Sequence, residues 1–229
     1  MTNSPLQFDP LELDADDALA EALSSRPLTR GGLLRAGAAA GALVAALTLT
    51  DEAEAAFAAS DVEILNYALT LEYLQASFYT EAERIGALRG RSRQAARVLG
   101  AVERAHVKAL QQALGSAAVG RPRFNFQGTT EDGRKFLKTA VAFEDLAVAA
   151  YKGQAPLVQS DALLAAAVSI HSVEARHAAW MRHLFGITPA AKAFDPPESR
   201  SKIERIVQST HFIAAPARTR GQGAPRYTG

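Results

Sequence analysis

Apolar residues recur every three or four positions along four long segments of the chain. This spacing places them on one face of an α-helix. The four segments cover approximately residues 62–85, 92–114, 132–153 and 160–184. The pattern predicts an all-α chain built around four amphipathic helices.

Residues that favour helix ends flank these segments. Asp61 and Ser160 are the expected N-caps of the first and fourth helices, because a short side-chain oxygen can accept from free backbone N–H groups. Gly115 and Gly186 are expected to end the second and fourth helices. Residues 115–132 contain Gly, Pro and Asn, and fully extended they could span about 55–60 Å, more than a helix of about 23 residues. That length permits a long crossover between the second and third helices.

The chain outside the four segments has a different character. Pro196 and Pro197 precede a short amphipathic helix, predicted at about residues 198–207, and residues 214–229 are rich in Gly, Pro and Arg. We expect a mobile N-terminus over residues 1–56, a four-helix bundle over residues 57–190 and a C-terminal extension over residues 191–229.

The helical region contains an internal repeat. A Glu followed seven residues later by a Tyr occurs in the first and third helices, and a Glu-x-x-His motif occurs in the second and fourth. The repeated pairs are Glu72 and Glu144, Tyr79 and Tyr151, Glu103 and Glu174, and His106 and His177. The single Glu and the Glu-x-x-His motif lie 31 residues apart in the first half and 30 in the second. Two such halves indicate a pseudo-twofold bundle.

All four Glu and both His lie in the middle of the apolar faces, so they point into the bundle. A single uncompensated carboxylate in an apolar interior costs several kcal/mol. Two divalent ions would neutralise four carboxylates. Glu and His three residues apart on a helix can reach one ion, and the remaining two glutamates, Glu72 and Glu144, can bridge or terminate the pair. Carboxylate and imidazole ligands without thiolates suit iron or manganese.

The chain resembles the ferritin-like domain proteins of bacteria, some of which are exported and described as desiccation-related. The resemblance covers about residues 61–213 and rests on Glu72 with Tyr79, Glu144 with Tyr151, and the two Glu-x-x-His motifs. It implies a ferritin-like four-helix bundle with a long crossover between helices two and three. It also implies a di-metal site. Its ligands would be Glu72, Glu103, His106, Glu144, Glu174 and His177.

Three other residues are candidates for contacts with the ligands. Tyr79 and Tyr151 can hydrogen-bond carboxylates or pass electrons, and the alternative is simple core packing. His171 stands three residues before Glu174, but Gly100 occupies the matching position in the first half. A partly exposed helix histidine is therefore the competing interpretation of His171.

Composition removes several other classes of protein. The chain has 229 residues, no Cys and a net charge of +1. Disulfides, thiolate zinc sites, iron–sulfur clusters and cysteine nucleophiles are excluded. No block of like charge indicates nucleic-acid binding.

The N-terminal region has the three parts of an export signal. Arg26, Arg30 and Arg35 precede a soft apolar run, residues 36–50, which is followed by a small-residue step at residues 53–55. Residues 29–35 resemble a twin-arginine signal in which Gly31 replaces the second arginine. The run is short for a membrane span. We expect export to the periplasm or cell envelope, with no stable membrane span after processing; a chain whose signal is not functional would stay in the cytoplasm.

Three functions fit these features. The first is a ferroxidase-type di-iron protein that handles iron or protects against oxidative and desiccation stress, with dioxygen or peroxide as the oxidant. The second is dimanganese catalase-like or oxygenase activity with the same ligands. The third is a non-catalytic protective or scaffold protein on this fold. A homo-oligomer is compatible with each of them.

Overall fold

A computed structural model describes residues 57–214 of the chain. Its four long helices are α4 (Ala59–Ile85), α5 (Gly90–Leu114), α6 (Gly133–Gln154) and α7 (Asp161–Phe185). The shorter α8 (Arg200–Thr210) follows them, and single 3₁₀ turns, η2 (Gly115–Ala117) and η3 (Ala155–Leu157), extend α5 and α6. The predicted all-α fold with a short C-terminal helix is confirmed. The export signal and mobile region predicted for residues 1–56, and residues 215–229 of the predicted tail, lie outside the described residues.

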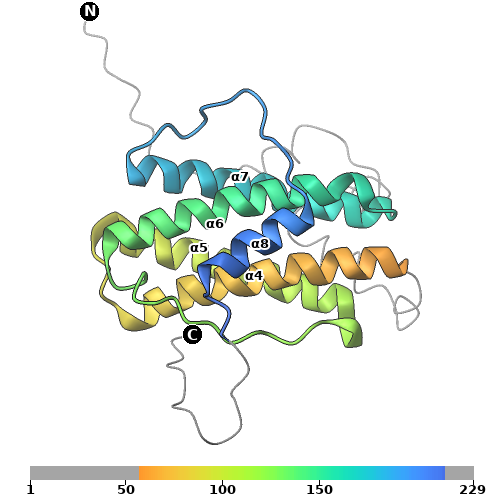
Figure 1. Ribbon diagram of the computed structural model, residues 1–229, viewed down its shortest axis with the longest axis horizontal. Coiled ribbons are helices and arrows are strands. Elements are labelled where there is room, and N and C mark those ends of the chain that lie inside the picture. Colours follow the sequence, from red (N-terminus) through yellow and green to blue (C-terminus); the bar gives the residue numbers. More distant parts are fainter. Residues whose placement is uncertain (1–56, 215–229) are drawn as a thin grey trace, which may run out of the picture. The chain divides into compact units, whose positions relative to one another are not determined.

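The four long helices form two hairpins. α4 packs most closely on α5, and α6 packs most closely on α7 (Figure 1). Residues 86–89 connect the first pair and residues 155–160 the second. Short connections of this kind make consecutive helices antiparallel neighbours. The two hairpins correspond to the two halves of the internal repeat.

Residues 115–132 form the long crossover between the hairpins, and they run back along α4 (Figure 1). Near its start, the Ala117 carbonyl accepts a hydrogen bond of 3.0 Å from the Asn66 side-chain amide. Near its end, the Thr130 hydroxyl donates to the Glu81 carboxylate over 2.7 Å. The crossover therefore returns the chain to the end of the bundle where α5 began.

Most of the predicted helix ends agree with the structure. The Asp132 side chain accepts from the backbone N–H of Lys135, and the Ser160 side chain accepts from that of Leu163. Gly186 ends α7 in the left-handed conformation with φ 86°, which glycine adopts at little cost.

The prediction for Asp61 is wrong. α4 begins two residues earlier, at Ala59, and Asp61 is a buried residue of its first turn. Its carboxylate instead accepts backbone N–H groups of Gln159 at 2.9 Å and Ser160 at 3.0 Å. Asp61 thus ties the start of α4 to the start of α7, and only the folded arrangement brings those residues together.

The C-terminal segment packs on the bundle. Ile203 and Val207 of α8 are buried, and a single antiparallel bridge joins Ile213 to Phe124 of the crossover. Before α8, the backbone N–H of Glu198 donates to the carbonyl of Ala149 in α6 over 3.1 Å. Within residues 57–214, no helix is both long and apolar enough to cross a membrane.

Candidate metal centre

The six predicted ligands meet in the middle of the bundle. α4 contributes Glu72 and α6 contributes Glu144, while α5 and α7 each contribute a Glu-x-x-His motif. All four glutamates are 0% exposed, and the two histidines are 9% and 7% exposed. The predicted ligands that meet here are Glu72, Glu103, His106, Glu144, Glu174 and His177. They face one another because each hairpin has its repeated residues at the same level along the bundle axis.

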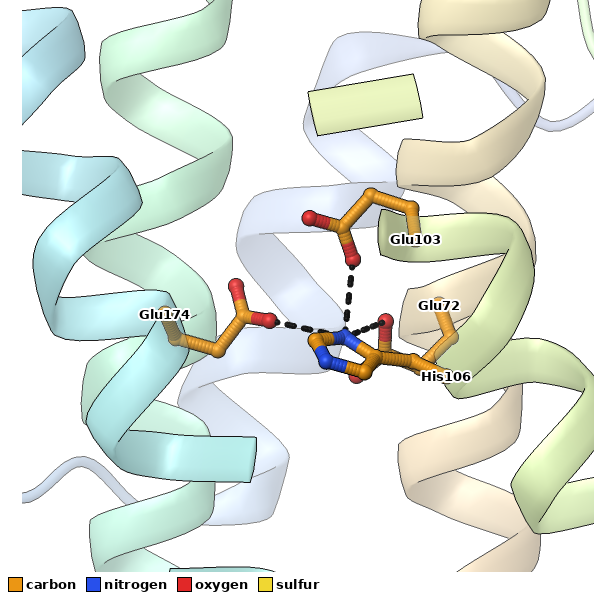
Figure 2. A group of neighbouring side chains, drawn as sticks. All are labelled: Glu72, Glu103, His106 and Glu174. Carbon is orange, nitrogen blue, oxygen red and sulfur yellow. Dashed lines mark hydrogen bonds and ion pairs between the residues drawn. The ribbon is translucent and has the colours of Figure 1, made fainter. Parts of the chain in front are cut away.

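One set of side chains surrounds His106 (Figure 2). Its Nδ1 lies 3.4 Å from a Glu72 oxygen, 3.2 Å from a Glu103 oxygen and 3.1 Å from a Glu174 oxygen. Three carboxylates therefore converge on one ring nitrogen, which can carry at most one proton. Such convergence is the arrangement expected around a cation.

A second set of side chains surrounds His177. Its Nδ1 lies 2.9 Å from a Glu103 oxygen and 3.5 Å from a Glu144 oxygen. Glu103, Glu144, Glu174 and His177 offer ligand atoms that all lie within 4.8 Å of one another, as do those of the set around His106. Glu103 and Glu174 belong to both sets, whereas Glu72 and Glu144 each belong to one. The geometry therefore favours Glu72 and Glu144 as terminal ligands and the two Glu-x-x-His carboxylates as shared ones.

The hydrogen bonding of the cluster tests whether these residues suit metal ions. One carboxylate oxygen of each glutamate is buried without a hydrogen-bond partner, and so is His177 Nδ1. Glu103 Oε1 and His177 Nδ1 face each other at 2.9 Å, yet neither makes a hydrogen bond. A buried polar atom without a partner costs about 1–3 kcal/mol. Five such atoms in one cluster fit a pair of metal ions, which would satisfy them all.

Two tyrosines hold the terminal glutamates across the bundle. Tyr79 of α4 donates a short hydrogen bond to Glu144 of α6, and Tyr151 of α6 donates to Glu72 of α4 over 2.6 Å. Each tyrosine therefore fixes one oxygen of the opposite hairpin's glutamate and leaves the other oxygen turned towards the histidines. Hydrogen bonds of this kind orient metal ligands.

Without metal, several residues of the cluster have raised pKa values and so keep their protons to higher pH than usual, among them Glu103, Glu174 and His177. Burial raises the pKa of Glu103 to about 7, although the neighbouring imidazoles of His106 and His177 act in the opposite direction. Burial and then the charge of Glu103 raise the pKa of Glu174 well above its usual range. Burial alone would lower the pKa of His177, but the carboxylates of Glu103 and Glu144 outweigh it and raise the pKa to about 10. Metal ions bound here would have to displace these protons.

His171 does not join the cluster, and it lies half-buried in a pocket beside Tyr151. Asp145, next to Glu144, lies outside the cluster and pairs through both oxygens with Arg182 at 2.8 Å.

Sequence reasoning missed Gln75, whose side-chain amide lies 3.5 Å from a Glu174 oxygen. Gln75 stands three residues after Glu72 on the same helix face, and this position could have identified it. The internal repeat does not indicate it, because Ala147 occupies the matching position.

The fold and this cluster define a four-helix bundle protein with a buried carboxylate–histidine cluster that could hold metal ions. A family model described as a ferritin-like domain matches residues 60–186, more than half of the chain. The chain therefore belongs to the ferritin-like domain family. A search of curated proteins finds no match to it.

Proposed function

We propose that this protein is a di-iron carboxylate protein of the ferroxidase type, acting in iron handling or in protection against oxidative and desiccation stress. The observation that carries the proposal is the sharing of Glu103 and Glu174 between two ligand sets, each completed by its own histidine and terminal glutamate. Two sets with a common pair of carboxylates suit two adjacent ions rather than one.

Charge supports two divalent ions. Four ionised glutamates carry four negative charges in a fully buried site, and two divalent ions balance them. Each ion would have carboxylate oxygens and one imidazole as ligands, and this donor set suits iron or manganese. It differs from the thiolate ligands of many structural zinc sites and from the all-oxygen ligands that magnesium prefers. Two ferrous ions in this site would supply the electrons that reduce dioxygen or peroxide.

The chain's own residues hold the site ready for that chemistry. Tyr79 and Tyr151 keep the terminal carboxylates turned inward, and burial raises the pKa of both phenols well above the usual range, so they remain hydrogen-bond donors. Burial of the four glutamates and the two histidines shields the site from bulk water. Because the ligand side chains are already ordered and shielded from water, little free energy is needed to reorganise them when the charge of the ions changes.

The test is metal analysis of the purified chain, with ferrous oxidation followed in the same sample. We expect about two irons per chain and rapid formation of ferric iron. Glu103→Ala should remove both ions and lower thermal stability, because it removes a shared ligand. Glu131→Gln, an exposed substitution in the crossover, is the matched control and should change neither.

The alternatives give different results in the same experiment. Manganese in place of iron, with turnover of peroxide, would support the dimanganese activity. A chain that binds neither ion after anaerobic loading, or a Glu103→Ala variant with unchanged metal content, would overturn the di-iron assignment and favour the protective or scaffold role.

We propose in addition that the protein is exported to the periplasm or cell envelope. The support is the order of Arg26, Arg30 and Arg35, the apolar run of residues 36–50 and the small residues at positions 53–55. Mass spectrometry of the chain recovered from a host's envelope fraction tests this. A new N-terminus near residue 56 is the expected result, and an intact chain in the cytoplasm contradicts it.

A further inference from the structure

The starts of α5 and α6 carry a cluster of exposed cationic side chains. Both helices begin at the same end of the bundle (Figure 1), and a side-chain carbon added at Gly133 of α6 would lie 3.9 Å from Ser92 Oγ of α5. The exposed cations at the start of α5 are Arg89, Arg91, Arg93 and Arg97, and those at the start of α6 are Arg134, Lys135 and Lys138. We refer to these seven residues as the basic end.

The charges of the basic end are not balanced by ion pairs within residues 57–214. Ion pairs of the described surface involve cations elsewhere, such as Arg104, Arg182, Arg200 and Lys202. Arg89 donates to two backbone carbonyls, and the Arg134 guanidinium lies 5.8 Å from the centre of the Phe185 ring. Neither contact neutralises a charge. Two exposed acids, Glu131 and Asp132, precede α6, so the seven cations outnumber the acids beside them.

This distribution of charge works against the stability of the two helices. α4 and α7 begin at the other end of the bundle, and their first turns contain Asp61 and Asp161, whereas the first turns of α5 and α6 contain no acid. Cations in a first turn are repelled by the positive end of the helix dipole. Like charges four residues apart, as in Arg93 and Arg97, repel each other as well. An anionic partner would relieve both kinds of repulsion.

The cations are spread too widely for a single small anion. At a rise of about 1.5 Å per residue, Arg91 to Arg97 covers about 9 Å along α5, and Arg134 to Lys138 covers about 6 Å along the neighbouring α6. One group of the size of a phosphate can contact only a few of these side chains, whereas an extended anionic surface can contact all of them. The arrangement therefore favours an extended partner.

Two exposed apolar side chains accompany the cations. Val98, beside Arg97, is 40% exposed. Ile187, two residues beyond the Phe185 ring that Arg134 contacts, is 41% exposed. Cations together with exposed apolar side chains suit the boundary between the head groups and the acyl chains of a bilayer. A nucleic-acid backbone would satisfy the charges but would offer no apolar phase to Val98 and Ile187. Anionic lipid is the better match.

From these unpaired charges, their spread over two neighbouring helices and the apolar side chains beside them, we propose that the basic end docks the protein on an anionic phospholipid surface. The starts of α5 and α6 then face the lipid head groups, and the starts of α4 and α7 point away from them. The contact is peripheral and largely electrostatic, so it weakens as the salt concentration rises. None of the six candidate ligands belongs to the basic end, and the proposal does not rest on the proposed iron chemistry.

The first experiment locates the contact with a fluorescent label. The chain has no Cys, so Ala87→Cys places a single environment-sensitive fluorophore at the basic end, and Ser116→Cys places one at the opposite end. Each labelled full chain is titrated with vesicles of phosphatidylglycerol and phosphatidylcholine, and with vesicles of phosphatidylcholine alone. We expect a blue shift for the label at position 87 with the anionic vesicles only. A shift confined to position 116, where α4 begins, or an equal response to both kinds of vesicle would overturn the proposal.

The second experiment removes charge in matched pairs from the chain labelled at position 87. Arg93→Gln with Arg97→Gln should weaken binding to the anionic vesicles by about 25-fold, because each cation at such a surface contributes about fivefold to the affinity. Lys108→Gln with Arg205→Gln also removes two exposed cations, but outside the basic end, and should change the affinity by less than about twofold because salt screens distant charges. Equal losses in the two double variants would mean that net charge sets the binding, which overturns the proposal.

Other anions are tested with the same labelled chain. Tighter binding to duplex DNA than to the vesicles at equal salt would overturn the lipid assignment in favour of nucleic acid. Release from the vesicles by inorganic phosphate at matched ionic strength would overturn it in favour of a small-anion site. All titrations use the metal-free chain, so their outcome is separate from that of the proposed function, since a chain that oxidises no iron can still bind vesicles.

Discussion

The two hairpins meet segments from outside the bundle at equivalent positions but in different ways. Nine residues after Glu72, the buried Glu81 accepts a hydrogen bond from Thr130 of the crossover. Nine residues after Glu144, Gly153 makes room for the backbone of Glu198, whose carbonyl oxygen would overlap any side-chain carbon at that position. One hairpin holds its neighbour by a hydrogen bond between side chains, and the other by close backbone packing.

This difference shows which parts of the repeat the structure needs. The six candidate ligands and the two tyrosines match in both halves, as the proposed pair of ions would require, since it would take the same donors from each side. The crossover lies beside α4 and the C-terminal segment lies beside α6, so the outward positions face different partners and have different residues. The repeat therefore keeps the candidate ligands and the two tyrosines, and it varies at positions that face the surface.

The largest expected effect comes from removing shared and terminal ligands in turn. Glu174→Ala should lose both ions, as Glu103→Ala should, because each takes a ligand from both sets. Glu72→Ala should keep the ion beside His177, and Glu144→Ala should keep the ion beside His106. Metal content per chain, measured after identical anaerobic loading, distinguishes these outcomes. Terminal variants that lose both ions, or shared variants that keep one, would contradict the assigned roles.

The sequence predicted the local features of this fold well. The shared helix face of Glu103 and His106, and of their repeats, follows from helical spacing alone, and the start of α7 follows from the side chain of Ser160. These inferences succeeded because every relevant contact lies within one helix or in its repeat.

Long-range contacts escaped sequence reasoning for a physical reason. The use of Asp61 to hold Gln159 and Ser160, and the bridge between Phe124 and Ile213, join segments far apart in the chain. Periodicity describes which face a residue occupies, but not which segment covers that face. For the same reason, the sequence left open whether Glu72 and Glu144 would bridge the two metal ions or bind one each. Only the folded bundle determines the distances between these carboxylates and the other candidate ligands.

A smaller effect is expected from Gly153→Ala, which tests the backbone packing of the second hairpin. The added carbon would push the Glu198 backbone away from α6, and overpacking of this kind costs about 1–3 kcal/mol. Gly133→Ala is the control, because its added carbon meets only Ser92 Oγ at 3.9 Å. Urea unfolding of both variants measures the difference in the free energy of unfolding. If Gly153→Ala and Gly133→Ala have equal free energies of unfolding, the segment before α8 does not pack closely against α6.

The smallest expected effect concerns Gln75, which contacts a candidate ligand in a way that the other hairpin does not repeat. Its amide lies 3.5 Å from a Glu174 oxygen, at the outer limit of a hydrogen bond, while Ala147 in the other hairpin offers nothing to Glu103. Gln75→Leu keeps the volume similar and removes the donor, so iron affinity should fall by less than about tenfold, equivalent to roughly 1.4 kcal/mol. Gln112→Leu, exposed on α5, is the control for an added apolar side chain. Because Glu174 belongs to both ligand sets, the affinities for the two ions should fall together in an iron titration. A loss confined to one ion would show that Gln75 acts on one set alone, and would mean that Glu174 is not shared equally between the ions.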